Sequence, residues 1–268
     1  MKFAFMTANY VARELNYTDS LDWGKCHQAT FEAFHGDQFS TKFEELISTI
    51  KGLGFDAIEL WIAHLDPLKA TPKMIEEANA ILKRYGVDVI SYTAGFGAPG
   101  VTEEEVRRTL ETAKAIGAPV LAQGFHPDNG PVVRPLAEEY GIYVGLENHP
   151  EKTPQDVINK VATFSPWVGS ALDTGWFATQ GYDAVQAVYD LKDHLVHVHL
   201  KDVKAVGAHD TCALGDGIVD IKGVMAALKA IGYTGPMTVE HEPHIYDPSA
   251  EAKESLERVR TWWQEINA

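Results

Sequence analysis

The stretch 143–150, YVGLENHP, is an apolar strand that ends in an acidic residue and a histidine. Because residues two apart in a strand share a face, Glu147 and His149 are expected to point the same way, opposite to Leu146. A carboxylate placed there needs a cation or a proton as its partner. The alternative is a strand end at which Glu147 simply reaches solvent, and this stretch alone does not choose between the two.

On both sides of this stretch, apolar runs alternate with amphipathic helical patterns. The runs predict strands at 2–7, 56–62, 87–92, 119–124, around Glu147, and at 167–172, 195–200 and 236–239. Patterns with capping or proline signals predict helices at 40–54, 71–86, 102–117, 132–140, 153–164, 182–191, 220–231 and 249–266. Eight alternating pairs in a chain of 268 residues predict an α/β protein, the (β/α)8 TIM barrel, as a single domain over 1–268.

The main competing fold is a doubly wound open sheet. Such a sheet usually has a glycine-rich phosphate turn after its first strand, and residues 6–10, MTANY, contain no glycine. Residues 9–38 instead hold aromatic residues, histidines and acids without a steady period. This segment is predicted to be a long loop after strand 1, either a functional loop or lid, or a packed structural excursion.

The acidic composition restricts the partners. There are 23 Lys and Arg against 38 Asp and Glu, so the formal charge of −15 repels phosphate backbones and anionic membranes. No basic patch offsets it, and nucleic acid is not expected as a partner. No window approaches the roughly 20 apolar residues of a membrane span.

The cysteine usage and the N-terminal sequence favour the cytoplasm. Cys26 and Cys212 are far apart, which disfavours a disulfide framework and favours a reducing compartment. The first fifteen residues, MKFAFMTANYVAREL, lack the features of a signal peptide.

Trp262 and Trp263 on the last helix are expected to pack internally or to form the surface of a homo-oligomer.

Four neighbouring strands end in residues that can bind a metal ion. In this type of barrel the catalytic groups come from the C-terminal ends of the strands. The residues at these ends are Glu147, Asp173, His199 and Glu240. Each alone also fits a capping or core role, but three carboxylates and one imidazole at the same height favour one divalent metal. The oxygen-rich set suits Mn2+, with Mg2+ or Co2+ as alternatives, and the cation would relieve the repulsion among the carboxylates.

The motifs in the second half of the chain resemble a known family. GLENHPE (145–151), ALDTGW (171–176), HVHLKD (197–202), LGDGIVD (214–220) and GYTGPMTVEHE (232–242) are similar to motifs of the sugar phosphate isomerase/epimerase group. These are xylose isomerase-like TIM barrels, akin to ketose 3-epimerases and related to endonuclease IV. The resemblance spans essentially the whole chain, and its motifs are less specific before Gly141.

The resemblance implies a site and a reaction. It places the metal ligands at Glu147, Asp173, His199 and Glu240, and it makes Glu147 and Glu240 the catalytic pair that moves a proton on opposite faces of a sugar. A metal near a carbonyl and its neighbouring hydroxyl favours the enediolate formed by proton loss. The implied function is a metal-dependent isomerase or epimerase of a small sugar or sugar derivative.

Further residues at predicted strand ends are candidate substrate contacts. His64, His126, His149 and Lys201 can hydrogen-bond sugar hydroxyls, and Trp176 can stack on the ring. For the histidines and the lysine the alternative is a loop residue facing water, and for the tryptophan it is the core.

Two departures from the family pattern keep other functions open. Trp176 stands where ketose epimerases usually have a histidine, and Lys201 and Asp202 follow His199 where an arginine is often found. The first alternative is a metal-dependent lyase that eliminates the aglycone from a 3-oxo-glycoside, with His149 as base or acid. The second is a non-catalytic sugar-binding barrel. The endonuclease branch needs additional histidine ligands and a nucleic-acid surface, and the acidic charge argues against it.

Overall fold

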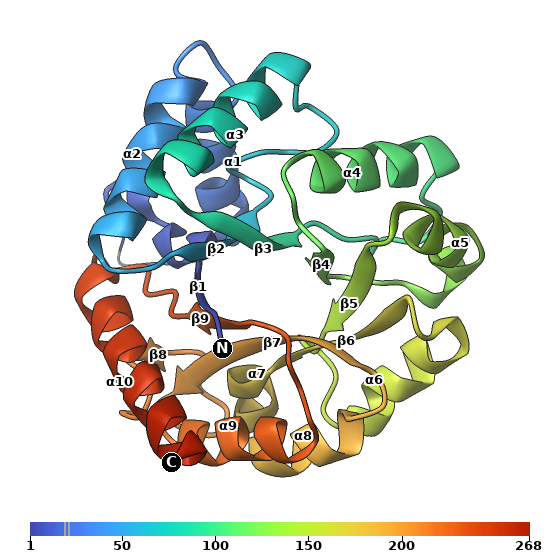
Figure 1. Ribbon diagram of the computed structural model, residues 1–268, viewed down its shortest axis with the longest axis vertical. Helices are drawn as coiled ribbons and strands as arrows, with labels where there is room; N and C mark the ends of the chain where they lie inside the picture. Colours follow the sequence, from blue (N-terminus) through green and yellow to red (C-terminus); the bar gives the residue numbers. More distant parts are fainter. Residues whose placement is uncertain (19, 21) are drawn as a thin grey trace.

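A ring of parallel strands surrounded by helices forms the computed structural model, which describes residues 1–18, 20 and 22–268 (Figure 1). The strands are β1 (Phe3–Met6), β2 (Ala57–Trp61), β3 (Asp88–Thr93), β4 (Val120–Gln123), β5 (Tyr143–Glu147), β6 (Val168–Asp173), β7 (Leu195–Val203), β8 (Thr211–Cys212) and β9 (Met237–Glu240). Strands β1 to β7 pair in chain order, and β9 pairs with both β7 and β1. This parallel ring closes the sheet and confirms the predicted TIM barrel.

The helices cover the outside of the ring. They are α1 (Trp23–Phe34), α2 (Phe39–Gly52), α3 (Pro72–Tyr85), α4 (Glu103–Ala115), α5 (Gly130–Tyr140), α6 (Pro154–Val161), α7 (Thr174–Thr179), α8 (Ala184–Leu191), α9 (Ile221–Ala230) and α10 (Ser249–Asn267), with short 3-10 helices η1 (Thr7–Tyr10), η2 (Arg13–Leu15), η3 (Pro127–Asn129) and η4 (Ala162–Phe164). Among the described residues, none of these helices combines the length and apolar character needed to cross a membrane.

Local capping signals explain why the predicted helices form where they do. Thr102 and Thr153 each make a capping box at the start of α4 and α6, which satisfies free backbone N–H groups of the first turn. At the other end, Gly86 and Gly141 terminate α3 and α5 with φ angles of 60° and 69°, a left-handed conformation that glycine adopts at little cost.

The segment 9–38 is more ordered than a loop. It contains η1, η2 and the twelve-residue helix α1, while Asp19 and Leu21 of this segment lie outside the described residues. The helix buries only Cys26, Thr30 and Phe34, one residue per turn. So narrow an apolar stripe leaves little periodic signal in the sequence, because a helix on a protein surface usually buries a wider one.

Two further elements lie between the predicted strands and helices. The short helix α7 follows β6 directly, and its N-cap is Asp173, whose side chain accepts a hydrogen bond from the Trp176 backbone N–H. Strand β7 continues to Val203, three residues beyond the predicted end, because its last residues pair antiparallel with β8.

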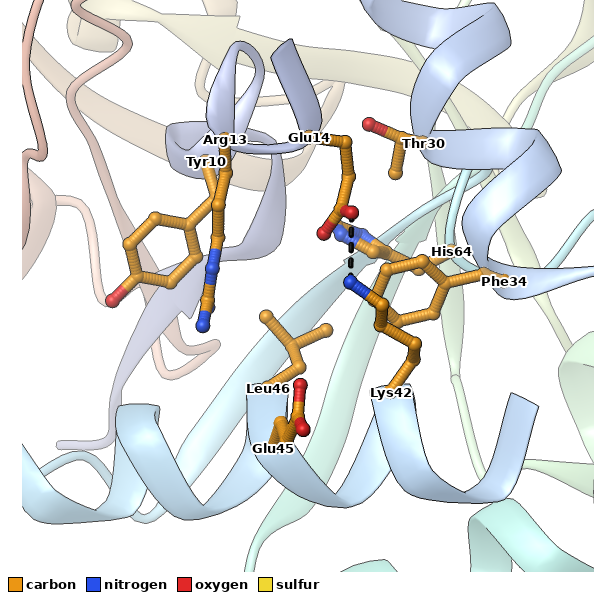
Figure 2. Close-up of a pocket in the computed structure, with 9 residues that line it drawn as sticks. All are labelled: Tyr10, Arg13, Glu14, Thr30, Phe34, Lys42, Glu45, Leu46 and His64. Carbon is orange, nitrogen blue, oxygen red and sulfur yellow. Dashed lines mark hydrogen bonds and ion pairs between the residues drawn. The ribbon is translucent and has the colours of Figure 1, made fainter. Parts of the chain in front are cut away.

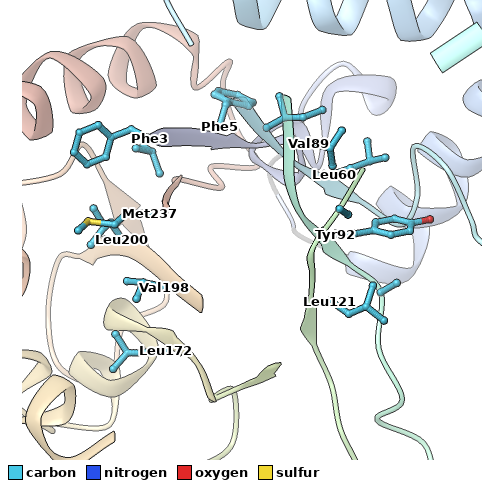
Figure 3. Close-up of a cluster of buried hydrophobic side chains, with 14 of the residues drawn as sticks. Phe3, Phe5, Leu60, Val89, Tyr92, Leu121, Leu172, Val198, Leu200 and Met237 are labelled. Atoms are coloured by element: carbon cyan, nitrogen blue, oxygen red, sulfur yellow. The ribbon is translucent and has the colours of Figure 1, made fainter. Parts of the chain in front are cut away.

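Alternation along the strands separates an outer apolar layer from a polar interior. The outer side chains form a belt between the ring and the helices that includes Phe5, Leu60, Leu121, Leu172, Val198 and Met237 (Figure 3). Each such burial contributes about 1.5–3 kcal/mol to folding. Inside the ring, small residues such as Ala4 and Ala57 pack near the N-terminal ends of the strands. The C-terminal ends are left for charged side chains.

Candidate metal centre

Four buried side chains converge at the C-terminal end of the barrel. One possible ligand atom from each of Glu147, Asp173, His199 and Glu240 lies within 4.8 Å of the others. The parallel register explains this convergence, because it pairs Asp173 with His199 across β6 and β7 and places Glu240 beside Lys201 across β7 and β9. The structure thus brings together all four residues that were predicted as metal ligands.

The atoms of this cluster are arranged around one nitrogen of His199. Its Nδ1 lies 2.9 Å from Glu240 Oε2, 3.2 Å from Glu147 Oε1 and 4.0 Å from Asp173 Oδ2. Asp173 Oδ2 and Glu240 Oε2 are buried without a hydrogen-bond donor among the described residues. Since a buried carboxylate oxygen without a partner is costly, these two oxygens fit a cation, and the hard oxygen-rich set fits Mn2+ or Mg2+.

The pKa values of the cluster reflect the same cost of burying carboxylates without enough partners. Burial raises the pKa of Asp173, and the negative charges of Glu240 and Glu147 add to the effect against the opposing Lys201, so that the pKa reaches about 7. Burial also disfavours the charged form of Glu147, but the positive charges of His149 and His199 hold its pKa well below the ordinary range. The carboxylates therefore depend on nearby protons and cations, which a divalent ion would replace.

Glu59 supports His199 from inside the barrel and was not found from the sequence. Its Oε1 lies 3.0 Å from His199 Nε2, and its Oε2 lies 2.8 Å from His197 Nε2 and accepts a hydrogen bond of 2.7 Å from Thr238 Oγ1. All four side chains are fully buried. A proton on His199 Nε2 directed at Glu59 leaves Nδ1 as the nitrogen that faces the three carboxylates.

The sequence does carry a signal for Glu59. It is a charged residue in the middle of an apolar run, DAIELWI, and it shares a strand face with Ala57 and Trp61. An acid buried inside a strand needs a partner, and burial alone would raise its pKa. The positive charges of His199 and His197 instead hold the pKa of Glu59 far below its usual value.

A cavity of about 520 Å³ lies over the cluster. Of the predicted substrate contacts, His149, Trp176 and Lys201 line it together with Glu147 and Glu240. The opposite side is formed by residues from the first half of the chain, namely Met6, Ala8, Trp23, Gly24, His27, Trp61, Thr93 and Gln123. The cavity thus has a charged side and a largely apolar side.

His149 is a second proton carrier next to Glu147. Its Nε2 lies 3.2 Å from Glu147 Oε1, its ring meets Trp176 edge-on at 5.1 Å, and its side chain is 42% exposed. Burial lowers the pKa of His149, but the negative charge of Glu147 outweighs this and raises the pKa to about 9. The pair can therefore share and pass on a proton.

Lys201 holds two carboxylates on the opposite side of the cluster. Its buried Nζ lies 2.6 Å from Glu240 Oε1 and 2.9 Å from Glu242 Oε2. Glu242 also lines the cavity and was not predicted, although it lies two residues after Glu240 within the motif 232–242. Burial raises the pKa of Glu242, to about 8, despite the contact with Lys201.

His64 does not line the cavity over the metal cluster. It is buried behind Trp61, with ring centres 5.5 Å apart, and its Nδ1 lies 3.1 Å from Thr7 Oγ1. Figure 2 shows it beside Phe34 in a separate small pocket. Burial lowers the pKa of His64 to about 3, so the ring is neutral. His64 therefore lies apart from the cluster cavity, and its contact with a sugar stays a prediction.

His126 is also away from the cavity. Its Nδ1 accepts a hydrogen bond of 3.3 Å from the Asp128 backbone N–H, which caps η3. The side chain is 38% exposed. A position at a strand end predicts where a residue lies along the barrel axis. The turn that follows the strand decides where its side chain points. The contact of His126 with a sugar likewise stays a prediction.

Comparison with known proteins shows which barrels this chain is similar to. A family model described as a xylose isomerase-like TIM barrel matches residues 47–262. An inosose dehydratase of Geobacillus thermodenitrificans is 30% identical over 147 residues, which are 47% of this chain and 49% of that protein. An L-ribulose-5-phosphate 3-epimerase of Escherichia coli is 30% identical over 97 residues, which are 36% of this chain and 34% of that protein. The matches span about a third to a half of these relatives.

The similarity to solved structures extends over the whole chain. A D-tagatose 3-epimerase-like protein aligns with a TM-score of 0.71 and 20% identity, and the alignment covers 100% of this chain and 98% of that one. At this identity the similarity shows a shared fold.

Proposed function

We propose that this chain, which belongs to the xylose isomerase-like TIM barrel family, is a divalent-metal-dependent isomerase or epimerase of a small sugar or sugar derivative. The observation that carries the proposal is the buried cluster of Glu147, Asp173, His199 and Glu240 beneath an open cavity. Two of its oxygens lack a donor among the described residues. The proposed substrate is a small carbohydrate and the proposed location is the cytoplasm, while the charge of −15 argues against nucleic acid as a partner.

The two glutamates of the cluster are the proposed acid and base. Glu147 on β5 and Glu240 on β9 approach His199 Nδ1 from different strands, at 3.2 and 2.9 Å. One of them removes a proton from the carbon beside a carbonyl, and the other returns a proton to complete the isomerisation or epimerisation. A divalent cation held by the four residues, with Mn2+ as the first choice, supplies charge stabilisation for the substrate oxygens.

The neighbouring side chains position the pair and the sugar. His149 keeps Glu147 in place and can exchange a proton with it, and Lys201 does the same for Glu240 through its 2.6 Å contact. Both residues, with Trp176, line the cavity and are proposed to contact the substrate.

A lyase is the second candidate, and His149 is the observation that favours it. Elimination needs a base for the proton beside the carbonyl and an acid for the leaving group. His149 provides a partly exposed proton carrier next to Glu147 within the same cavity. One relative is named an inosose dehydratase, and a dehydratase performs an elimination.

Solvent exchange separates these functions. Mn2+-loaded protein is incubated in D2O with a panel of ketoses and 3-oxo-glycosides, and mass spectrometry follows deuterium incorporation and free aglycone. Deuterium without cleavage supports the isomerase or epimerase, and cleavage supports the lyase. Mn2+ binding without either product would overturn both and leave a non-catalytic sugar-binding barrel.

A further inference from the structure

Side-chain amides continue the barrel beyond the ends of two strand pairs. The regular pairing of β5 with β6 in the described chain ends at Glu147 and Ala171, two residues before Asp173. The side chain of Asn148 takes the place of the next strand residue. Its Nδ2 donates to the Asp173 carbonyl at 3.0 Å, and its Oδ1 accepts from the Asp173 backbone N–H at 2.8 Å. We call this pair of hydrogen bonds from one side chain to the backbone an amide clamp.

The amide clamp of Asn148 connects two members of the metal cluster. Asn148 follows Glu147 directly in the chain and binds both backbone groups of Asp173. The carboxylate of Asp173 is held as well, because its Oδ1 accepts the hydrogen bond from the Trp176 N–H at the start of α7. Oδ2 is then the oxygen left for the cluster, and it has no donor among the described residues. The clamp therefore fixes how the carboxylates of Glu147 and Asp173 are spaced.

Asn9 forms the same kind of amide clamp around Glu240. It lies in η1, beyond the last regular pair of β1 with β9, which joins Phe5 to Val239. Its Nδ2 donates to the Val239 carbonyl at 3.2 Å, and its Oδ1 accepts from the His241 backbone N–H at 2.8 Å. Val239 and His241 are the two neighbours of Glu240 in the chain. The amide therefore holds the backbone on both sides of this cluster residue.

The chemistry of the two clamps requires an amide. Asn9 and Asn148 are both fully buried, and each meets one backbone acceptor and one backbone donor whose roles are fixed. An amide offers both functions, whereas a carboxylate of the same shape lacks the donor. An apolar side chain would leave two buried backbone groups without partners, which is costly. Neither asparagine is among the described residues that line the cavity over the cluster, so substrate contact does not explain them.

We propose that Asn9 and Asn148 are positioning residues that hold the metal site at the size of a small divalent ion such as Mn2+. The assignment rests on the proposed function for the presence of the ion. The two clamps act on all three carboxylate residues of the cluster, while Glu59 orients the fourth member, His199. A site of fixed size favours a small ion, whereas Ca2+ accepts longer and more variable distances to its ligands.

Metal binding in the absence of substrate tests the two clamps. Titration calorimetry of the metal-free protein measures the affinity for Mn2+ and, separately, for Ca2+. In Asn148→Ala and in Asn9→Ala the Mn2+ affinity is expected to fall by about 10- to 100-fold, as for other outer partners of metal ligands. The Ca2+ affinity should fall by about threefold or less, because this ion tolerates a looser site. The preference for Mn2+ over Ca2+ should therefore decrease, which a loss of stability alone would not cause.

Asn129→Ala is the matched control. Asn129 is also buried, and its amide donates to the carbonyls of Phe96 and Ala98 and accepts from the N–H groups of Gly100 and Val101. These partners belong to the segment between β3 and α4, which contains no member of the metal cluster. The control variant should lower the urea concentration at the midpoint of unfolding and leave both metal affinities unchanged.

The outcomes separate the clamps from the proposed function. Asn148→Ser and Asn9→Ser, whose hydroxyl can still bond to one backbone group, are measured in parallel in case an alanine variant does not fold, and an intermediate loss of Mn2+ affinity is expected. An unchanged Mn2+ affinity or an unchanged ratio of Mn2+ to Ca2+ affinity in the folded clamp variants would overturn the inference, as would an equal loss in Asn129→Ala. Absence of Mn2+ binding by the unaltered protein would overturn the proposed function instead.

Discussion

The two halves of the barrel contribute different chemistry to the same cavity. Strands β5 to β9 provide the charged wall, which consists of Glu147, Asp173, His199, Lys201 and Glu240. The first half, from β1 to β4 with η1 and α1, provides the largely apolar wall, which includes Met6, Ala8, Trp23 and Trp61 beside the uncharged polar Thr93 and Gln123. The described carboxylates that line the cavity all belong to the half that follows Gly141. The fold therefore separates the groups that move protons from the groups that shape the space for the substrate.

This division predicts which measured property should change when a residue in each half is replaced. Changes in the charged wall should alter metal affinity and the chemical step. Changes in the apolar wall should alter substrate affinity or stability. Glu59 tests the division, since it lies on β2 but bonds to His199 on the other side of the barrel.

The largest effect is expected for Glu147→Gln in the charged wall. Gln has nearly the same shape but cannot accept the proton, so solvent deuterium exchange should fall by about 10² to 10⁴-fold or below detection. The measurement is deuterium incorporation by mass spectrometry on the Mn2+-loaded variant. Glu104→Gln, on the exposed surface of α4, is the matched control and should retain full exchange. Exchange retained in Glu147→Gln would remove this residue from the proposed pair.

A smaller effect is expected for Glu59→Gln, because Glu59 belongs to the first half of the barrel but contacts His199 in the second half. The neutral amide no longer fixes the proton on His199 Nε2, so Nδ1 is less available to the metal. Loss of such an outer partner lowers metal affinity by about 10- to 100-fold. Titration calorimetry of metal-free protein with Mn2+ measures it, with the surface change Glu44→Gln as the control. An unchanged affinity would make Glu59 a stabilising residue without influence on the metal.

The barrel was predictable because its signals are local. Each strand of the ring is a short, mainly apolar segment of four or more residues, and the helices begin at capping residues such as Thr102 and end at residues such as Gly86. Helix α1 was missed because its buried positions form one narrow stripe. Helix α7 was not predicted because it has only six residues, too few for a periodic apolar pattern, and its N-cap Asp173 is also a candidate ligand. When one residue both caps a helix and can bind a metal ion, the sequence pattern does not reveal both roles.

The residues of the candidate site were predictable only where a side chain that can bind a metal ion stands at the end of a strand. The four cluster residues each stand where an apolar run stops, and the parallel register brings them together. Glu59 lies inside a run, and its partner His199 is 140 residues away, so only the folded barrel connects them. His64 follows a strand after a turn, where alternation no longer fixes the direction of a side chain.

His64 offers a test of the apolar half through stability. Its pKa in the folded state is about 3, lowered by burial, whereas an unfolded histidine titrates near 6.5. Below about pH 6.5 the unfolded chain gains a proton that the folded chain cannot accept, so the stability present above this pH is lost as the pH falls toward 3. Between pH 7 and pH 5 this costs about 2 kcal/mol.

His64→Asn should remove that loss. Asparagine does not titrate and can still bond to Thr7 Oγ1, the partner of His64 Nδ1. Urea unfolding at pH 7 and pH 5 measures the difference, and the variant should lose about 2 kcal/mol less than the wild type over this range. Equal losses in both proteins would mean that His64 titrates normally, and the apolar half would then contain a solvated histidine.

The smallest effect is expected for Trp61→Phe in the apolar wall. Trp61 lines the cavity and packs edge-on against Trp23 and His27, with ring centres 6.3 and 5.6 Å apart. The smaller ring keeps an aromatic face but loses part of the contact area, so KM should rise by about 2- to 10-fold. Because Trp61 touches none of the groups that move the proton, kcat and Mn2+ affinity should be unchanged. A fall in kcat of similar size would show that the apolar wall also takes part in the chemical step, and the division of labour between the two halves would fail.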